Sequence, residues 1–318
     1  MIFQFRKNLI LVVRGGTFDP ADFVDIGNRI AARAPDVRVF VVDDAVSAGD
    51  LPANVWSDPT LTLSFRSKFK FRPKRGVHLY NRPIEKLDQA AMMMRLGVDV
   101  PHCEKFVPGK ALPRELWADH VILKPEDLKL TSHGNFVQIF RRERLQAMAL
   151  SSFAPSHPVH KTPMIVQRFI DTGEYPCKYR ALTLQGEVLY CQRVTLPAKR
   201  PGLDALDEVL EAAAIDTGIG IPEYLPAKDA DVLAFAKRIA GVFGGIPLLG
   251  IDIIRAHDTG RLYALEVNAG GNVWHFSSPY WEGRRKKYPH VAREMHDQFG
   301  AFDVAAKALI SATRRLAS

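Results

Sequence analysis

The sequence has few cysteines and no long apolar run. Its 318 residues include only Cys103, Cys177 and Cys191, and none of them forms a CxxC pair. Neither a disulfide framework nor a zinc site is therefore indicated. The longest unbroken apolar stretches, such as Leu9–Val13, fall far short of the roughly 18 residues that a membrane helix needs. With no recognisable targeting segment, we expect a cytoplasmic protein that makes no membrane contact.

Signatures of nucleic-acid binding are also missing. The chain carries 43 Lys and Arg against 35 Asp and Glu, a net charge of +8, with basic runs at 68–75 and 284–287. No helix-turn-helix, zinc-finger or aromatic RNA-binding pattern accompanies this excess. The basic runs are compatible with a solvated face or with a field that attracts an anionic ligand such as a nucleotide. We expect no nucleic-acid partner.

What is present is the composition of a packed α/β enzyme. Hydrophobic residues make up 47% and charged residues 25% of the chain, as in soluble globular proteins, and the length favours about two domains. The opening predicts a strand over 9–13, a helix over 20–34 and a second strand over 37–42. A strand, helix, strand unit of this spacing favours parallel pairing with a right-handed crossover. A helix is predicted over 83–96, and the second half is rich in predicted strands.

The most informative segment is a predicted β-hairpin near the C-terminus. Two apolar runs, 248–255 and 262–267, flank a short link that contains Asp, Thr and Gly. If the pairing is symmetric about Thr259, Asp252 and Glu266 lie opposite each other, and Asn268 points to the same face. Two carboxylates among apolar residues repel each other unless a cation is present, and oxygen ligands suit Mg²⁺. Acids that face solvent would give the same pattern, so both interpretations stay open.

This segment resembles the closing motif of the ATP-grasp superfamily of ATP-dependent ligases. The matching string runs from Gly250-Ile251-Asp252 to Glu266-Val267-Asn268 and on to Gly271. In that family the Asp, Glu and Asn hold one or two Mg²⁺ ions on ATP, and Mn²⁺ can replace them. The resemblance implies that Asp252, Glu266 and Asn268 are the metal ligands and that ATP is the cofactor.

Other family motifs follow in the expected order from about Asn81 to Gly271. Lys86 is similar to the first phosphate-contacting lysine, and Lys124, followed by Pro125, is similar to the second, which reaches the α- and β-phosphates. The run Gln167-Arg168-Phe169-Ile170 resembles the strand beside adenine. The family usually has a Gly/Ser-rich loop after the second lysine. Here 126–135 contains one glycine, so Ser132 and Gly134 are the residues expected to cover the phosphates, less completely than usual.

Two arginines extend the resemblance to one branch of the superfamily. Arg180 and Arg193 stand on consecutive predicted strands, where the branch that contains the ribosomal-protein glutamate ligase carries basic residues. The implied role of both is catalytic: Arg193 steadies the acyl phosphate and the tetrahedral oxyanion, and Arg180 assists. A pair of exposed strand residues is the alternative interpretation.

The resemblance implies an ATP-grasp architecture of three parts. These are an N-terminal α/β domain over 1–80, a linker helix and lid subdomain over 81–165, and an antiparallel-sheet subdomain over 166–318. The implied activity is an ADP-forming carboxylate-amine ligase that proceeds through an acyl phosphate. Its partners would be small-molecule or peptide carboxylates and amines, and a homodimer is allowed. A kinase that phosphorylates a hydroxyl, or a non-catalytic nucleotide-binding regulator, would use the same lysines and metal ligands.

Overall fold

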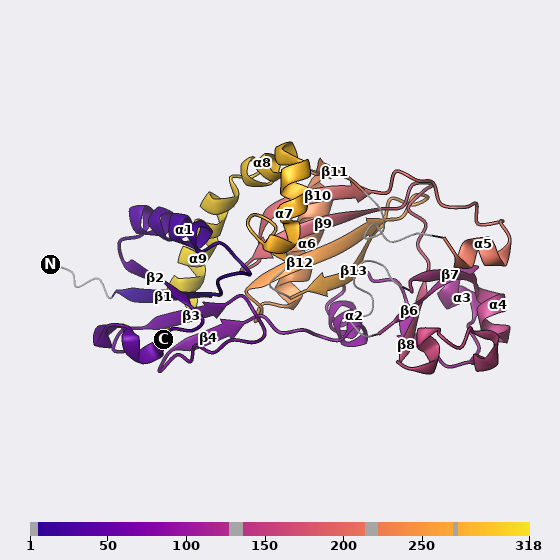
Figure 1. Cartoon of the computed structure of the whole chain (residues 1–318), viewed down its shortest axis with the longest axis horizontal. Coiled ribbons are helices and arrows are strands. Elements are labelled where there is room, and N and C mark those ends of the chain that lie inside the picture. The colour runs from indigo at the N-terminus through magenta and orange to yellow at the C-terminus, as the bar shows by residue number, and fades with distance from the viewer. Residues whose placement is uncertain (1–5, 127–135, 214–221, 270–272) are drawn as a thin grey trace.

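The described residues form three β-sheets, and along the horizontal long axis of Figure 1 the first and second sheets of the chain lie at the two ends with the third between them. The structure is a computed structural model that describes residues 6–126, 136–213, 222–269 and 273–318. Within those ranges every helix is too short or too polar to cross a lipid bilayer. All three cysteines carry free thiols.

The first sheet is parallel and has the strand order β2-β1-β3-β4. Its elements are β1 (Lys7–Val13), α1 (Pro20–Arg33), β2 (Val37–Asp43), β3 (Thr60–Ser64) and β4 (Val77–Tyr80). Helix α1 begins where the Asp19 side chain accepts a hydrogen bond from the Ala21 amide, with Pro20 in the first turn. The predicted parallel pairing of the first two strands is confirmed.

The second sheet is antiparallel, in the order β5-β8-β6-β7. It contains β5 (Cys103–Lys105), α3 (Arg114–Trp117), β6 (His120–Pro125), β7 (Gln138–Arg141), α4 (Arg142–Ala147) and β8 (Met164–Arg168). Helix α2 (Lys86–Arg95) precedes it and links the first sheet to the other two. The helix begins at Lys86, three residues after the predicted start at 83, because the backbone is still extended at its N-cap residue, Glu85.

The third sheet is antiparallel and has the order β11-β10-β9-β12-β13. It is formed by β9 (Cys177–Leu184), β10 (Glu187–Thr195), β11 (Glu223–Pro226), β12 (Leu248–Arg255) and β13 (Leu262–Asn268), with α5 (Asp207–Glu211) before β11. Helix α6 (Ala230–Val242) packs Phe235 and Ile239 against one face, where Ile251 and Ile253 lie. The other face carries the candidate site at one end.

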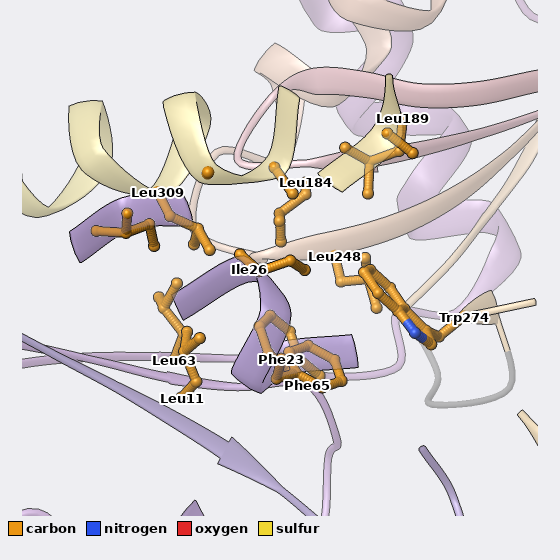
Figure 2. Packing of buried hydrophobic residues seen from close by; sticks show 14 of the residues in the cluster. Leu11, Phe23, Ile26, Leu63, Phe65, Leu184, Leu189, Leu248, Trp274 and Leu309 are labelled. Atoms are coloured by element: carbon orange, nitrogen blue, oxygen red, sulfur yellow. The ribbon is translucent and has the colours of Figure 1, made fainter. Parts of the chain in front are cut away.

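The C-terminal helices return to the first sheet. They are α7 (Glu282–Lys287), α8 (Pro289–Asp297) and α9 (Ala301–Leu316). The predicted interruption falls at Gly300, whose φ of 66° separates α8 from α9. Helix α9 packs on α1, so the core in Figure 2 joins the two ends of the chain to the third sheet. Short 3-10 turns occupy Ala48–Asp50, Ala53–Val55, Leu150–Ser152, Pro158–His160 and Pro279–Trp281.

Candidate nucleotide and metal site

A row of polar side chains crosses four strands of the third sheet. Gln192 lies opposite Arg180, Arg180 opposite Asp252, and Asp252 opposite Glu266. Residues directly opposite each other in a ladder share a face, so all four side chains point to the same side. The predicted Asp252 and Glu266 pair is therefore present. Toward the turn the pairing shifts by one residue, because a bulge follows Asp252.

Asp252 is a buried carboxylate held by two cations. Only 1% of its side chain is exposed, and its Oδ2 lies 2.9 Å from Arg180 Nη2 and 3.1 Å from Lys178 Nζ. Arg180 Nε forms an ion pair with Oδ1. Burial alone would raise the pKa of Asp252, but these two cations outweigh it and hold the pKa below its ordinary value. Asp252 is thus a carboxylate, not an acid, at neutral pH.

Glu266 and Asn268 complete an oxygen-rich cluster on β13. Both are partly exposed, and Asn268 Nδ2 donates a 3.4 Å hydrogen bond to Glu266 Oε1. In the described part of the chain, no three His, Cys, Asp or Glu side chains gather as a metal site. The candidate set instead combines two carboxylates with an amide. Asp252 Oδ1 is buried and accepts no aligned hydrogen bond. This donor set fits a hard cation such as Mg²⁺.

Both predicted lysines make contacts near the end of β6. Lys86 is 7% exposed, and its Nζ donates to the Pro125 carbonyl oxygen at 3.3 Å. Lys124 Nζ donates to Gln167 Oε1 at 2.7 Å. Lys86 therefore contacts the residue that follows Lys124, and Lys124 contacts Gln167 of β8.

Helix α2 ties these lysines to the acidic strand through Gln89. This side chain is 1% exposed, accepts from the Val267 amide at 2.8 Å and donates to the Val267 carbonyl at 3.0 Å. Val267 stands between Glu266 and Asn268, and Gln89 lies one turn after Lys86. The helix that carries Lys86 is thus hydrogen-bonded to the strand that carries Glu266 and Asn268. Sequence reasoning missed Gln89, whose one signal is a glutamine at a core position of the helix.

The segment predicted to lie beside adenine begins in the last two residues of β8 and continues beyond the strand. The Arg168 amide donates to His102 O at 2.7 Å, and the Phe169 amide donates to His120 O at 3.1 Å. Both donors are thus engaged within the protein, so a purine edge would be read here by carbonyl groups or by Ile170. Ser132 and Gly134, which were predicted to cover the phosphates, lie outside the described residues.

Arg193 does not join the row that contains Arg180. The ladder pairs Arg193 with Tyr179 and pairs Arg180 with Gln192. Since successive strand residues point to opposite faces, Arg193 projects on the side of the sheet that α6 covers. It is exposed there and lines a groove of about 730 Å³ with Tyr175, Glu223 and others. The prediction that Arg193 and Arg180 act on one intermediate is therefore corrected: only Arg180 faces the acids.

Two residues of this face were not predicted. Lys178 precedes Arg180 by two positions and so shares its face, and the alternation along β9 could have revealed it. Gln192 is 3% exposed, and its Oε1 has no hydrogen-bond partner among the described residues.

Buried rings close the far side of the site. Tyr190 Oη and His275 Nδ1 are 2.7 Å apart, and the His275 ring stacks on Trp281 with centroids 4.0 Å apart. Burial, with help from Arg180 and other cations, lowers the pKa of His275 well below its ordinary value, so the imidazole is neutral. Trp274 and Trp281 are both buried and belong to the packed core.

Comparison with known proteins identifies the fold. No protein-family profile and no curated protein sequence matches the chain. Among solved structures, the macrocyclase MdnC from Microcystis aeruginosa MRC, bound with the precursor peptide MdnA, matches with a TM-score of 0.50 and 13% identity, over 96% of this chain and 99% of that one. The ATP-grasp ligase PsnB, complexed with a phosphomimetic variant of its minimal precursor, Mg and ADP, matches with a TM-score of 0.51 and 16% identity.

The match to PsnB covers 96% of this chain and 98% of that one. Since the likeness extends over almost the whole length of each protein, it includes all three sheets and the helices between them. The chain has the ATP-grasp fold.

Proposed function

We propose that this protein is an ATP-dependent ligase that activates a carboxylate as an acyl phosphate for attack by an amine, releasing ADP and phosphate. The observation that carries the proposal is the contact chain from the acids to the lysines. Gln89 binds the backbone of β13 between Glu266 and Asn268, and Lys86 on the same helix reaches the end of β6 beside Lys124. Cationic phosphate ligands next to an oxygen-rich metal site are what phosphoryl transfer requires.

Each residue has a distinct role in this proposal. Lys86 and Lys124 bind the phosphates, and Gln167 orients the Lys124 ammonium through its 2.7 Å hydrogen bond. Asp252, Glu266 and Asn268 would hold Mg²⁺, which neutralises phosphate charge when bound. Arg180 presents its guanidinium from the same face, where it can stabilise negative charge on the acyl phosphate and on the oxyanion.

The proposed reaction has two balanced steps. An oxygen of the substrate carboxylate bonds to the γ-phosphorus of ATP, and the bond from that phosphorus to the bridging oxygen breaks, which releases ADP. The amine nitrogen then bonds to the acyl carbon, phosphate leaves with the electrons of the carbon–oxygen bond, and the nitrogen loses a proton. The protein positions the reactants and supplies charge, and no covalent intermediate with a side chain is needed.

An ADP-release screen tests the proposal. Purified protein with Mg·ATP is given carboxylates and amines in pairs, peptides included because MdnC and PsnB were both solved with precursor peptides. Hydroxylamine serves as a second nucleophile, since it converts acyl phosphates to stable hydroxamates. We expect ADP and free phosphate only when acid and nucleophile are both present.

The pattern of products separates the proposal from its rivals. Phosphate retained on an acceptor would indicate a kinase, and Mg·ATP binding without turnover for any pair would indicate a nucleotide-binding regulator. The double variant Asp252→Asn, Glu266→Gln should lose turnover. Glu187→Gln, on β10 of the same sheet, removes only the surface partner of Lys237 and should keep turnover. Full activity in the double variant would remove the metal assignment.

A further inference from the structure

Lys178 competes for the carboxylate that the proposed metal would use. Its Nζ lies 3.1 Å from Asp252 Oδ2, the same oxygen that accepts from Arg180 Nη2 at 2.9 Å. The Lys178 side chain is only 16% exposed, so the interaction is poorly screened by solvent. The Lys178 ammonium therefore interacts strongly with the Asp252 carboxylate.

The oxygens of Asp252 have limited capacity. A carboxylate oxygen offers two lone pairs, and Oδ2 already has two cationic neighbours, while Oδ1 forms an ion pair with Arg180 Nε. A divalent cation that takes Oδ2 as a ligand must therefore displace one of these two cations, and a cation at Oδ1 would be repelled by both. Arg180 contacts both oxygens and Lys178 contacts one. The lysine also has a flexible four-carbon stem, so it is the group that yields.

We propose that Lys178 is a positioning residue that opposes divalent-cation binding at Asp252 until nucleotide arrives. This inference rests on the proposed function, because the triphosphate supplies the anion to which the displaced ammonium moves. Metal and nucleotide then bind together rather than separately. As a consequence, the site binds the bare cation weakly and binds the metal nucleotide complex well.

Removing the Lys178 charge should change two affinities in opposite directions, that for the bare cation and that for the metal nucleotide complex. Without the Lys178 charge, the buried carboxylate attracts a divalent cation more strongly, so the bare cation binds more tightly. The phosphates lose a cationic partner at the same time, so the metal nucleotide complex binds less tightly. A lysine with a merely structural role would weaken both affinities together or leave both unchanged.

Calorimetric titration with Mn²⁺ tests the proposal on the whole protein. Lys178→Met should bind Mn²⁺ alone about tenfold more tightly than the wild type. It should bind the non-hydrolysable ATP analogue AMPPNP, in saturating Mn²⁺, about tenfold less tightly. Lys178→Arg keeps the charge and should retain the weak Mn²⁺ binding of the wild type. Lys237→Met removes an exposed ion pair between α6 and Glu187 of β10, and should change neither affinity.

The outcomes distinguish this inference from the proposed function. Unchanged or weaker Mn²⁺ binding by folded Lys178→Met, with normal nucleotide binding by the wild type, would overturn the inference alone. A wild type that binds no metal nucleotide would overturn both. If Lys178→Met does not fold, as its melting curve will show, Lys178→Gln replaces it as the neutral variant, with the same two expected shifts.

Discussion

At the scale of single residues, Asp252 is the buried anion that holds two cations of the site. It is buried with two cations, and taking three charged groups out of water carries a large desolvation cost that their attraction must offset. Such a cluster contributes little net stability compared with an apolar core. Removing the Asp252 charge nevertheless destabilises the fold, because Arg180 and Lys178 would be left without their shared anion.

The Asp252→Asn variant should therefore unfold more easily, by about 3–5 kcal/mol at neutral pH. The wild type should show a related loss in acid. Because the folded pKa of Asp252 is depressed, its contribution is fully present above the ordinary pKa of 3.8 and is lost as pH falls through the lower folded value. Urea denaturation from pH 7 to 3 measures both effects. Equal acid sensitivity in the wild type and the variant would contradict this assignment.

Lys124 gives a second prediction at this scale. Lys124→Ala should raise the dissociation constants of ATP and ADP alike, because it is assigned to the α- and β-phosphates. A lost charged hydrogen bond is worth about 1.5–3 kcal/mol, or roughly 10- to 150-fold in affinity. Calorimetry provides the measurement, with Lys105→Ala, an exposed lysine of the same sheet, as the control. An ADP affinity that does not change would place Lys124 away from these phosphates.

At the scale of elements, one side chain of helix α2 holds the helix against the third sheet. Gln89 bonds both backbone groups of Val267 and also donates to the Ile84 carbonyl at 2.8 Å. Strand β13 is at the edge of its sheet, so its outer backbone groups depend on such partners. The helix fixes the position of Lys86 relative to Glu266 and Asn268 in this way.

The Gln89→Leu variant should uncouple the helix from the strand. It leaves the Val267 amide and carbonyl unpaired, at about 1–3 kcal/mol for each buried group, and it should weaken ATP binding because Lys86 loses its fixed position. Gln298→Leu is a matched control, since Gln298 likewise bridges backbone groups, those of Cys191 and Ala227. Loss of stability is expected in both variants, and loss of ATP affinity in Gln89→Leu only. The same ATP affinity in both would mean that α2 does not set the site.

At the scale of the whole molecule, one core joins the first sheet, the third sheet and the C-terminal helix. Figure 2 shows Trp274 beside Phe23 of α1, near Leu248 of β12. The Trp274 and Phe23 rings stack with centroids 4.9 Å apart, and the indole Nε1 donates to Asp22 Oδ2 at 2.8 Å. The segment that follows β13 is thereby anchored to α1 at the residue that directly precedes His275.

The Trp274→Ala variant should lose about 3–5 kcal/mol of unfolding free energy, since a fully buried indole leaves a large cavity. The first and third sheets share this core, so we expect them to lose stability together in denaturation monitored by circular dichroism. Leu206→Ala, at a position that is 73% exposed, should change stability by less than about 0.5 kcal/mol. A mild effect of Trp274→Ala would mean that the domains are joined elsewhere.

Features that depend on local pattern could be predicted from the amino-acid sequence. The opening parallel unit follows from periodicity and spacing, and the Asp252 and Glu266 pair follows from the symmetry of a hairpin whose turn is nearby in the chain. The order of the lysines and acids indicated the ATP-grasp fold for the same reason. Their placement along the chain is itself a property of the sequence.

The folded chain was needed to show which strands of distant segments are neighbours and which of their faces coincide. Arg180 and Lys178 hold Asp252 because β9 pairs with β12, about 70 residues further along the chain. Arg193, in contrast, is turned away from the acids by the local β9–β10 hairpin, which pairs Arg180 with Gln192 and Arg193 with Tyr179. Local periodicity reports that a strand has two faces, but the face that meets the acids is set by long-range pairing, and that pairing depends on which apolar surfaces the folded chain can bury together.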